Sequence, residues 1–168
     1  DVERLMETAA EVGGAIDVVV ANAAVYHGEA GGTPLSAESY AAFDDHLRTN
    51  ARGTFATLRE ALPHLAPDAR IVVASGSVAR EPYSGYGSYA VSKAAAEAVA
   101  RGFAADTDHA VGVVDPGQVA TALTGGRGHD PAEAAAQFLW AIEEIPAERL
   151  DGAVLQREDW PEAPPDEG

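Results

Sequence analysis

The sequence predicts an α/β protein built on a sheet of parallel strands. Three observations support this fold class. Short runs of β-branched residues alternate along the chain with longer segments of helical periodicity. The runs are apolar at successive positions, which is typical of strands that are covered on both faces. Each run ends in small or turn-forming residues, so the chain is expected to cross over the sheet before the next strand.

The first half of the chain contains two predicted helices and one predicted strand. Residues 3–12 have the pattern of a helix, which Gly13 and Gly14 would end. The run that follows predicts a buried strand at 16–21. Residues 25–35 are rich in glycine and proline and indicate a loop, after which a long helix is expected at 36–64.

The second half repeats the alternation of strand and helix. A second buried strand is predicted at 69–77 and a helix at 87–105. A third strand at 109–117 is followed by a helix that opens at Asp130 and Pro131, which suit its cap and first turn. Residues 151–156 predict a last strand.

The chain has 168 residues, which is the size of one domain. We expect residues 1–157 to form a single folded unit. The last residues, including PEAPPDEG, are rich in proline and acidic side chains, so 158–168 is predicted to be a flexible tail.

The charge of the chain excludes several kinds of partner. The formal net charge is −16, and such a surface repels nucleic acid and anionic membranes. The excess of acidic residues with one lysine suggests a cytoplasm of high salt, where screening weakens self-repulsion. No apolar run is long enough to span a bilayer and no signal peptide is visible, so we predict a cytoplasmic protein. There is no cysteine, and the five histidines lack ligand spacing, so no metal site is expected.

Several polar residues follow the predicted strands, at the edge of a parallel sheet where ligands bind. Asn22 follows the first strand, Ser75 and Ser77 close the second, and Asp115 lies near the end of the third. Tyr89 and Lys93 lie on the helix after the second strand.

The spacing of Tyr89 and Lys93 has a chemical use. Residues four apart share one face of a helix, and Lys93 is the only lysine in the chain. A nearby ammonium lowers the pKa of a phenol from about 10 by about 1–3 units, which would allow Tyr89 to act as a general acid or base. The pattern alone is common by chance, but arginine would not replace a compact ammonium beside a phenol.

Four motifs in order strengthen this hypothesis. The segments VVASGSVAR and YAVSK resemble the short-chain dehydrogenase/reductase family, in which Ser77 would be the catalytic serine and Ser75 the alternative. VVVANAAV resembles the family's Asn-Asn-Ala-Gly segment, with Asn22 retained. LRTNARGTFATLREALPHL is similar to the helix with a further catalytic residue, here Asn50, and VVDPGQVATAL to a Pro-Gly segment followed by a threonine, here Thr121.

The resemblance implies a Rossmann-like doubly wound parallel sheet and an NAD(P)-dependent oxidoreductase. A hydride would pass between a nicotinamide, from NAD or NADP, and the carbon of a small carbonyl or alcohol substrate. Tyr89 would exchange the proton, and Lys93 would lower the pKa of Tyr89 and hold the ribose hydroxyls. Ser77 would bond the substrate oxygen, and Asn50 would hold a water that relays protons.

The resemblance also implies which residues contact the cofactor. In addition to Tyr89 and Lys93, these are Asn22, Pro116, Gly117, Val119 and Thr121. Simpler interpretations stay open: Asn22 as a strand-end cap, Asn50 as a helix residue bonded to nearby backbone, and Pro116 with Gly117 as a plain turn. A homodimer or homotetramer, packed through the helices at 36–64 and 87–105, is a further implication.

The chain departs from the family pattern at its start. No glycine-rich pyrophosphate turn precedes residue 16, so the resemblance implies that the first three strands of the full fold are missing and that 1–157 is the C-terminal part of the catalytic domain. The strand at 16–21 would then be an exposed edge. The segments TALTGGRGHDPAEAA and REDW resemble the carbonyl-reductase-like branch.

Two other functions share parts of this pattern. The first is a domain of the same fold that binds a dinucleotide or another protein without catalysis, against which the set of Asn50, Ser77, Tyr89 and Lys93 argues. The second is a nucleotide-sugar epimerase or dehydratase, which shares the Tyr-x-x-x-Lys pattern. The short region after Thr121 leaves little room for the sugar-nucleotide part of such an enzyme.

Overall fold

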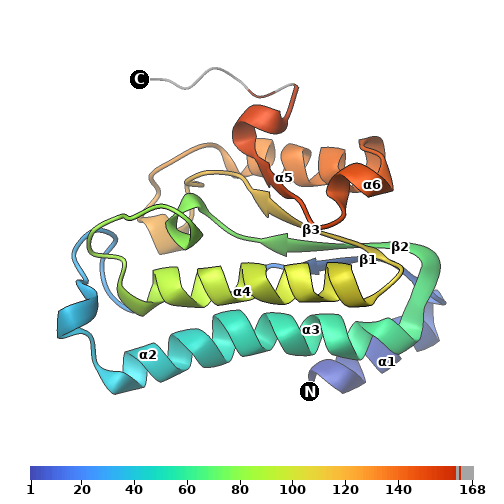
Figure 1. Ribbon diagram of the computed structural model, residues 1–168, viewed down its shortest axis with the longest axis horizontal. Coiled ribbons are helices and arrows are strands. Elements are labelled where there is room, and N and C mark those ends of the chain that lie inside the picture. The colour runs from blue at the N-terminus through green and yellow to red at the C-terminus, as the bar shows by residue number, and fades with distance from the viewer. Residues whose placement is uncertain (162, 164–168) are drawn as a thin grey trace.

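The computed structural model describes residues 1–161 and 163, and it consists of a parallel sheet with helices on both faces (Figure 1). The strands are β1 (Ile16–Ala21), β2 (Leu65–Ala74), β3 (Ala110–Asp115) and β4 (Val154–Gln156). They lie in the order β1-β2-β3-β4, and every neighbouring pair is parallel. The predicted α/β class is confirmed.

The helices form two layers. One face of the sheet is covered by α1 (Val2–Gly13), α2 (Tyr40–His46), α3 (Gly53–Ala61) and α4 (Gly87–Asp106), and the other by α5 (Pro131–Leu139) and α6 (Ala147–Leu150) (Figure 1). In the described part of the chain, no helix has both the length and the apolar character needed to cross a membrane.

Each layer encloses its own apolar core. The core under α3 and α4 includes Leu58, Ile71 and Val113, and the core under α5 includes Val72 and Trp140. Full burial of an aliphatic side chain of this size stabilises the fold by about 1.5–3 kcal/mol. The alternation of Ile71 and Val72 between the two cores shows why this strand is apolar at successive positions from Ile71 to Ala74.

The long helix predicted at 36–64 is interrupted. It begins at Tyr40, where the Ser39 side chain accepts a hydrogen bond from the Ala42 amide, and a separate 3-10 turn precedes it. A π-helical turn at Leu47–Arg52 separates α2 from α3. A π turn is defined by its i→i+5 backbone hydrogen bonds, and residue types do not specify these, so the sequence pattern does not reveal it.

The second strand also differs from its prediction. It begins at Leu65 rather than 69, because Leu65 pairs with Ile16 before the register shifts at Val18. It ends at Ala74, so Ser75 and Ser77 lie beyond the ladder. Small residues at the carboxyl end of a strand do not mark where pairing stops.

The packed part of the chain extends into the predicted tail. Trp160 is only 7% exposed and belongs to the core under α5, after a 3-10 turn at Arg157–Asp159. Burial of one aromatic ring outweighs the polar composition around it, so the flexible segment cannot begin at 158. Residues 162 and 164–168 lie outside the described residues.

One edge of the described sheet is open. Among the described strands, β1 pairs only with β2, so the predicted exposed edge is confirmed. Val18 and Val20 are 39% and 44% exposed. Val19 lies between them and is buried in the core under α3 and α4. The core under α5 takes strand residues from β2, β3 and β4, so the covering helices stop short of β1.

We predict that a polypeptide of these 168 residues aggregates through this edge, because unpaired strand groups beside exposed valines can pair with another chain. Val20→Lys should reduce light scattering on concentration without lowering the melting temperature. Val19→Lys is the matched control, and it should destabilise the fold because it buries a charge. Equal aggregation of the native chain and Val20→Lys would contradict this account.

Candidate active site

The carboxyl ends of the strands bring the four predicted catalytic residues into neighbouring elements. α4 packs against the π-turn that contains Asn50 and against the 3-10 turn Ser77–Ala79 that begins at Ser77. Tyr89 and Lys93 lie on the first two turns of α4. The common partner of these segments is therefore the helix with the Tyr-x-x-x-Lys pattern.

Lys93 is buried where β2 ends. Its side-chain nitrogen donates a hydrogen bond of 2.7 Å to the carbonyl oxygen of Ala74, the last residue of β2. Burial lowers the pKa of Lys93 to about 8, and the charges of Glu97 and Asp115 oppose this shift. The ammonium is thus removed from water, and the two carboxylates partly balance its charge.

The pKa of Tyr89 moves in the opposite direction from the prediction. Burial raises it to about 12, and the charges of Tyr26, Tyr86 and Asp115 act in the same direction. The predicted lowering assumed that the ammonium of Lys93 would dominate, but desolvation is the larger effect and that ammonium bonds to Ala74. Tyr89 therefore keeps its proton at neutral pH.

An aromatic cluster surrounds the phenol, and sequence reasoning missed it. The ring of Tyr26 lies 4.8 Å from that of Tyr89 and 6.3 Å from that of Tyr86, which in turn lies 6.0 Å from Tyr83. Tyr26 is fixed by a 2.8 Å hydrogen bond to the carbonyl of Glu29. These tyrosines lie in irregular segments, where no periodicity signals that they meet.

The two candidate serines differ in access. Ser77 is half-buried, and its hydroxyl lies 3.4 Å from that of Tyr83. Ser75 is buried, and its hydroxyl has no hydrogen-bond partner among the described residues. A substrate oxygen can reach Ser77 more easily, which favours the serine chosen from the sequence.

Asn50 has a structural role that its motif does not specify. Its side-chain oxygen accepts from the Val25 amide at 2.8 Å, and its nitrogen donates to the Val25 carbonyl and the Ser92 hydroxyl, both at 2.9 Å. Both amide hydrogens are used, so the side chain has no donor left for a relay water. It ties the loop after β1 to α4, as the simpler interpretation allowed.

The predicted cofactor residues other than Tyr89 and Lys93 follow two strands that are not adjacent. Asn22 is exposed directly after β1, whereas the other four follow β3. Gly117 has a positive φ of 73°, and its amide donates to the Asp115 carboxylate at 2.9 Å. Val119 pairs with His129, and Thr121 caps the short turn after it. Hydrogen bonds and a strand bridge therefore fix the backbone of the segment after β3.

A second network, which sequence reasoning did not predict, lies at the start of α4. His46 is fully buried; its Nδ1 lies 2.7 Å from the Ser88 hydroxyl, and its Nε2 accepts from the His27 amide at 2.9 Å. Since Nε2 accepts, the proton of the neutral ring is on Nδ1. A Glu38 carboxylate oxygen lies 3.4 Å from Nδ1.

Glu38 also holds the beginning of α4. Its other oxygen accepts from the Ser88 amide at 2.6 Å, at the helix end that favours negative charge. Gly87 has a φ of 51°, and a Cβ there would lie 2.9 Å from the same carboxylate oxygen. The glycine is required for this close approach.

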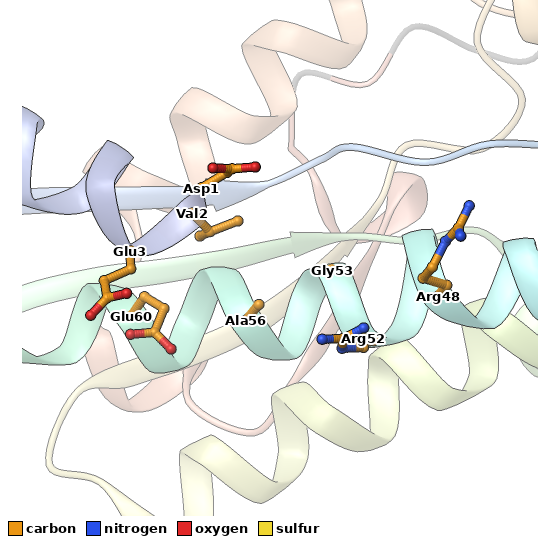
Figure 2. Close-up of a pocket in the computed structure, with 8 residues that line it drawn as sticks. All are labelled: Asp1, Val2, Glu3, Arg48, Arg52, Gly53, Ala56 and Glu60. Atoms are coloured by element: carbon orange, nitrogen blue, oxygen red, sulfur yellow. The ribbon is translucent and has the colours of Figure 1, made fainter.

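A hollow on the surface lies elsewhere. Figure 2 shows it between the chain start, with Asp1 and Glu3, and the helix residues Arg48 and Arg52. Its lining includes no residue predicted to be catalytic or to bind the cofactor. It is not the candidate site.

Comparison with known proteins shows the family. A family model described as enoyl-(acyl carrier protein) reductase matches residues 1–150. The chain belongs to this family, the short-chain dehydrogenases/reductases.

Individual relatives agree with this assignment. The chain is 32% identical over 148 residues to a short-chain dehydrogenase/reductase, FrzI, of Cladobotryum sp, covering 86% of this chain and 56% of that protein. It is 38% identical over 94 residues to the chloroplastic NADPH-dependent aldehyde reductase 2 of Arabidopsis thaliana, covering 53% and 35%. The structure resembles a short-chain dehydrogenase from Escherichia coli CFT073 complexed with NADPH, with a TM-score of 0.79, 25% identity and coverage of 93% and 68%. The chain thus spans little more than half of the first relative.

We predict that His46 makes stability depend on pH. Burial lowers its pKa in the folded state, so the unfolded chain binds the proton more tightly. The free energy of unfolding should therefore fall as the pH drops below about 6.5, by up to about 1.4 kcal/mol per pH unit. Urea unfolding at pH 7.5 and 5.0 measures this.

The variant His46→Gln keeps a donor and an acceptor but cannot titrate, so it should lose less stability over the same pH interval. His64→Gln, outside the network, should retain the native dependence. If His46→Gln loses as much stability as the native chain, another group is responsible.

Proposed function

We propose that this chain carries the catalytic part of an NAD(P)-dependent oxidoreductase, in which Tyr89 exchanges a proton with a carbonyl or alcohol oxygen. The observation that carries the proposal is the position of Tyr89 and a buried Lys93 four residues apart on one helix, which packs against the Ser77 turn and whose lysine bonds to the carboxyl end of β2. Membership of the family and the NADPH named for a similar structure support it.

The residues present fit the nicotinamide end of such a cofactor. Lys93 has three N–H donors, of which one is used by Ala74, so two can hold ribose hydroxyls. The exposed Gly117 leaves room for a ring against the turn after β3. No glycine-rich turn precedes β1 in this sequence, so the fit concerns the nicotinamide half. When bound, the cofactor supplies or accepts a hydride.

The protein's own residues manage the proton. Tyr89, with a pKa of about 12, is protonated at neutral pH and would donate its proton to the carbonyl oxygen as negative charge develops there. Ser77 would hydrogen-bond the same oxygen. This favours carbonyl reduction, and the aldehyde reductase among the relatives supports a small carbonyl substrate.

A non-catalytic domain is the second candidate. It is favoured by the Asn50 side chain, because both of its amide hydrogens are donated to Val25 and Ser92 and neither is left for a relay water. A homodimer or homotetramer stays a prediction, which the exposed Phe55 on α3 and Val91 on α4 support.

Replacing the phenol decides between these candidates. In the full gene product, Tyr89→Phe should lower kcat for aldehyde reduction by at least about 100-fold, because the proton donor is lost, while nucleotide affinity stays unchanged. Tyr40→Phe, at a residue 91% exposed on α2, is the matched control and should keep full activity. Undiminished turnover by Tyr89→Phe would exclude the proposed role.

The serine assignment has its own test. Ser77→Ala should reduce kcat by about 10²–10³-fold, the usual cost of losing one donor to the reacting oxygen. Ser75→Ala should reduce it far less, because that hydroxyl is buried. The reverse order of effects would transfer the catalytic role to Ser75.

A further inference from the structure

Two buried carboxylates and a partly exposed arginine lie beside the proposed site, and the proposed mechanism does not use them. Arg80 pairs through one guanidinium nitrogen with Glu97 and through another with Asp115. The side chains of Glu97 and Asp115 are only 2% and 4% exposed, and that of Arg80 is 26% exposed. Because the bridge is mostly removed from water, removing one partner is expected to be costly.

The three members of this bridge come from three segments of the proposed site. Arg80 follows the 3-10 turn that begins at Ser77, and Glu97 lies one helical turn after Lys93 on α4. Asp115 ends β3 and directly precedes Pro116. One guanidinium therefore connects the serine turn, the tyrosine helix and the turn after β3.

Asp115 transmits this connection to the turn that it precedes. One of its oxygens accepts from the Gly117 amide at 2.9 Å, while the other pairs with Arg80. Its backbone carbonyl accepts from Gln137 of α5 at 3.3 Å. The shape of the turn at Gly117 thus depends on a carboxylate that Arg80 holds in place.

The same carboxylates act on Lys93. Their charges raise its pKa, against the lowering by burial. Arg80 pairs with both carboxylates, and Arg101 reaches the second Glu97 oxygen at 4.0 Å from a side chain that is 56% exposed. Without Arg80, the negative charges of the two buried carboxylates would stabilise the ammonium of Lys93 more strongly. The pKa of Lys93 would therefore rise.

We propose that Arg80 is a positioning residue of this site: it holds the Ser77 turn, α4 and the Gly117 turn in one arrangement, and it screens Glu97 and Asp115 from Lys93. The effect of Arg80 on catalysis rests on the proposed function. Its effects on the pKa of Lys93 and on the arrangement of the three segments do not.

The single lysine makes the proposal measurable. In a polypeptide of these 168 residues, growth on lysine labelled with ¹³C at Cε gives one lysine signal, and its titration reports Lys93 alone. We expect a midpoint near 8 in the native chain, and a rise of about 1 pH unit or more in Arg80→Met. Arg101→Met is the matched control, since it removes an exposed cation from the same Glu97 and should shift the midpoint much less. Equal midpoints in Arg80→Met and Arg101→Met overturn the proposal.

A second readout tests the positioning. The Gly117 amide should lose protection from hydrogen exchange in Arg80→Met and keep it in Arg101→Met. Unchanged protection in both variants means that Asp115 holds the turn without Arg80, which contradicts the positioning role.

If Arg80→Met does not fold, Asp115→Asn is compared with Arg80→Met/Asp115→Asn. The double variant lacks Arg80 but has only one buried carboxylate, Glu97, whereas Arg80→Met has two. Arg101 remains near Glu97. The midpoint of Lys93 should be higher in the double variant, and equal midpoints overturn the proposal.

Neither readout measures turnover. A negative result therefore contradicts the role of Arg80, whereas undiminished activity of Tyr89→Phe contradicts the proposed function. If the oxidoreductase function holds, the pH profile of kcat in Arg80→Met should move upward with the Lys93 midpoint. A profile that stays in place while the midpoint moves limits Arg80 to a structural role and contradicts its part in catalysis.

Discussion

The geometry of the site depends on burying one ammonium at the carboxyl edge of a parallel sheet. A desolvated cation needs an acceptor and a compensating charge. The acceptor is the carbonyl of Ala74 at the end of β2, and the charge comes from Glu97 on α4 and Asp115 at the end of β3. Because neighbouring parallel strands end at the same edge, one lysine can use groups from two strands. Lys93 thereby fixes how α4 lies on the sheet.

The beginning of α4 is fixed by hydrogen bonds of a different kind. Glu38 and His46 hold Ser88, and Asn50 holds Ser92 together with the loop after β1. The partners in these bonds lie 42 to 50 residues apart in sequence. Tyr89 lies between these contacts, so the segment at 38–50 determines its position. A helix held at both ends of its first turns can keep a phenol in one orientation.

Local patterns in the sequence predicted the elements better than their contacts. β-branched runs located all four strands, and the spacing of Tyr89 and Lys93 placed both on one helix, because these features depend on neighbouring residues. The π-turn around Asn50, the bridge of Arg80 and the His46 network depend on residues distant in sequence, which no local pattern encodes. The sign of the Tyr89 shift was missed for the same reason: spacing identifies a nearby ammonium but not how deeply the phenol is buried.

Burial acts on the two central groups in a coordinated way. It raises the pKa of Tyr89 and lowers that of Lys93, because a medium of low polarity disfavours both the phenolate and the ammonium. The neutral phenol is the form that donates a proton, which agrees with the proposed carbonyl reduction. Alcohol oxidation needs the phenolate, which the ammonium must stabilise against this desolvation. Raising the pH above about 8 would deprotonate Lys93, so alkaline conditions would also remove the ammonium from the site.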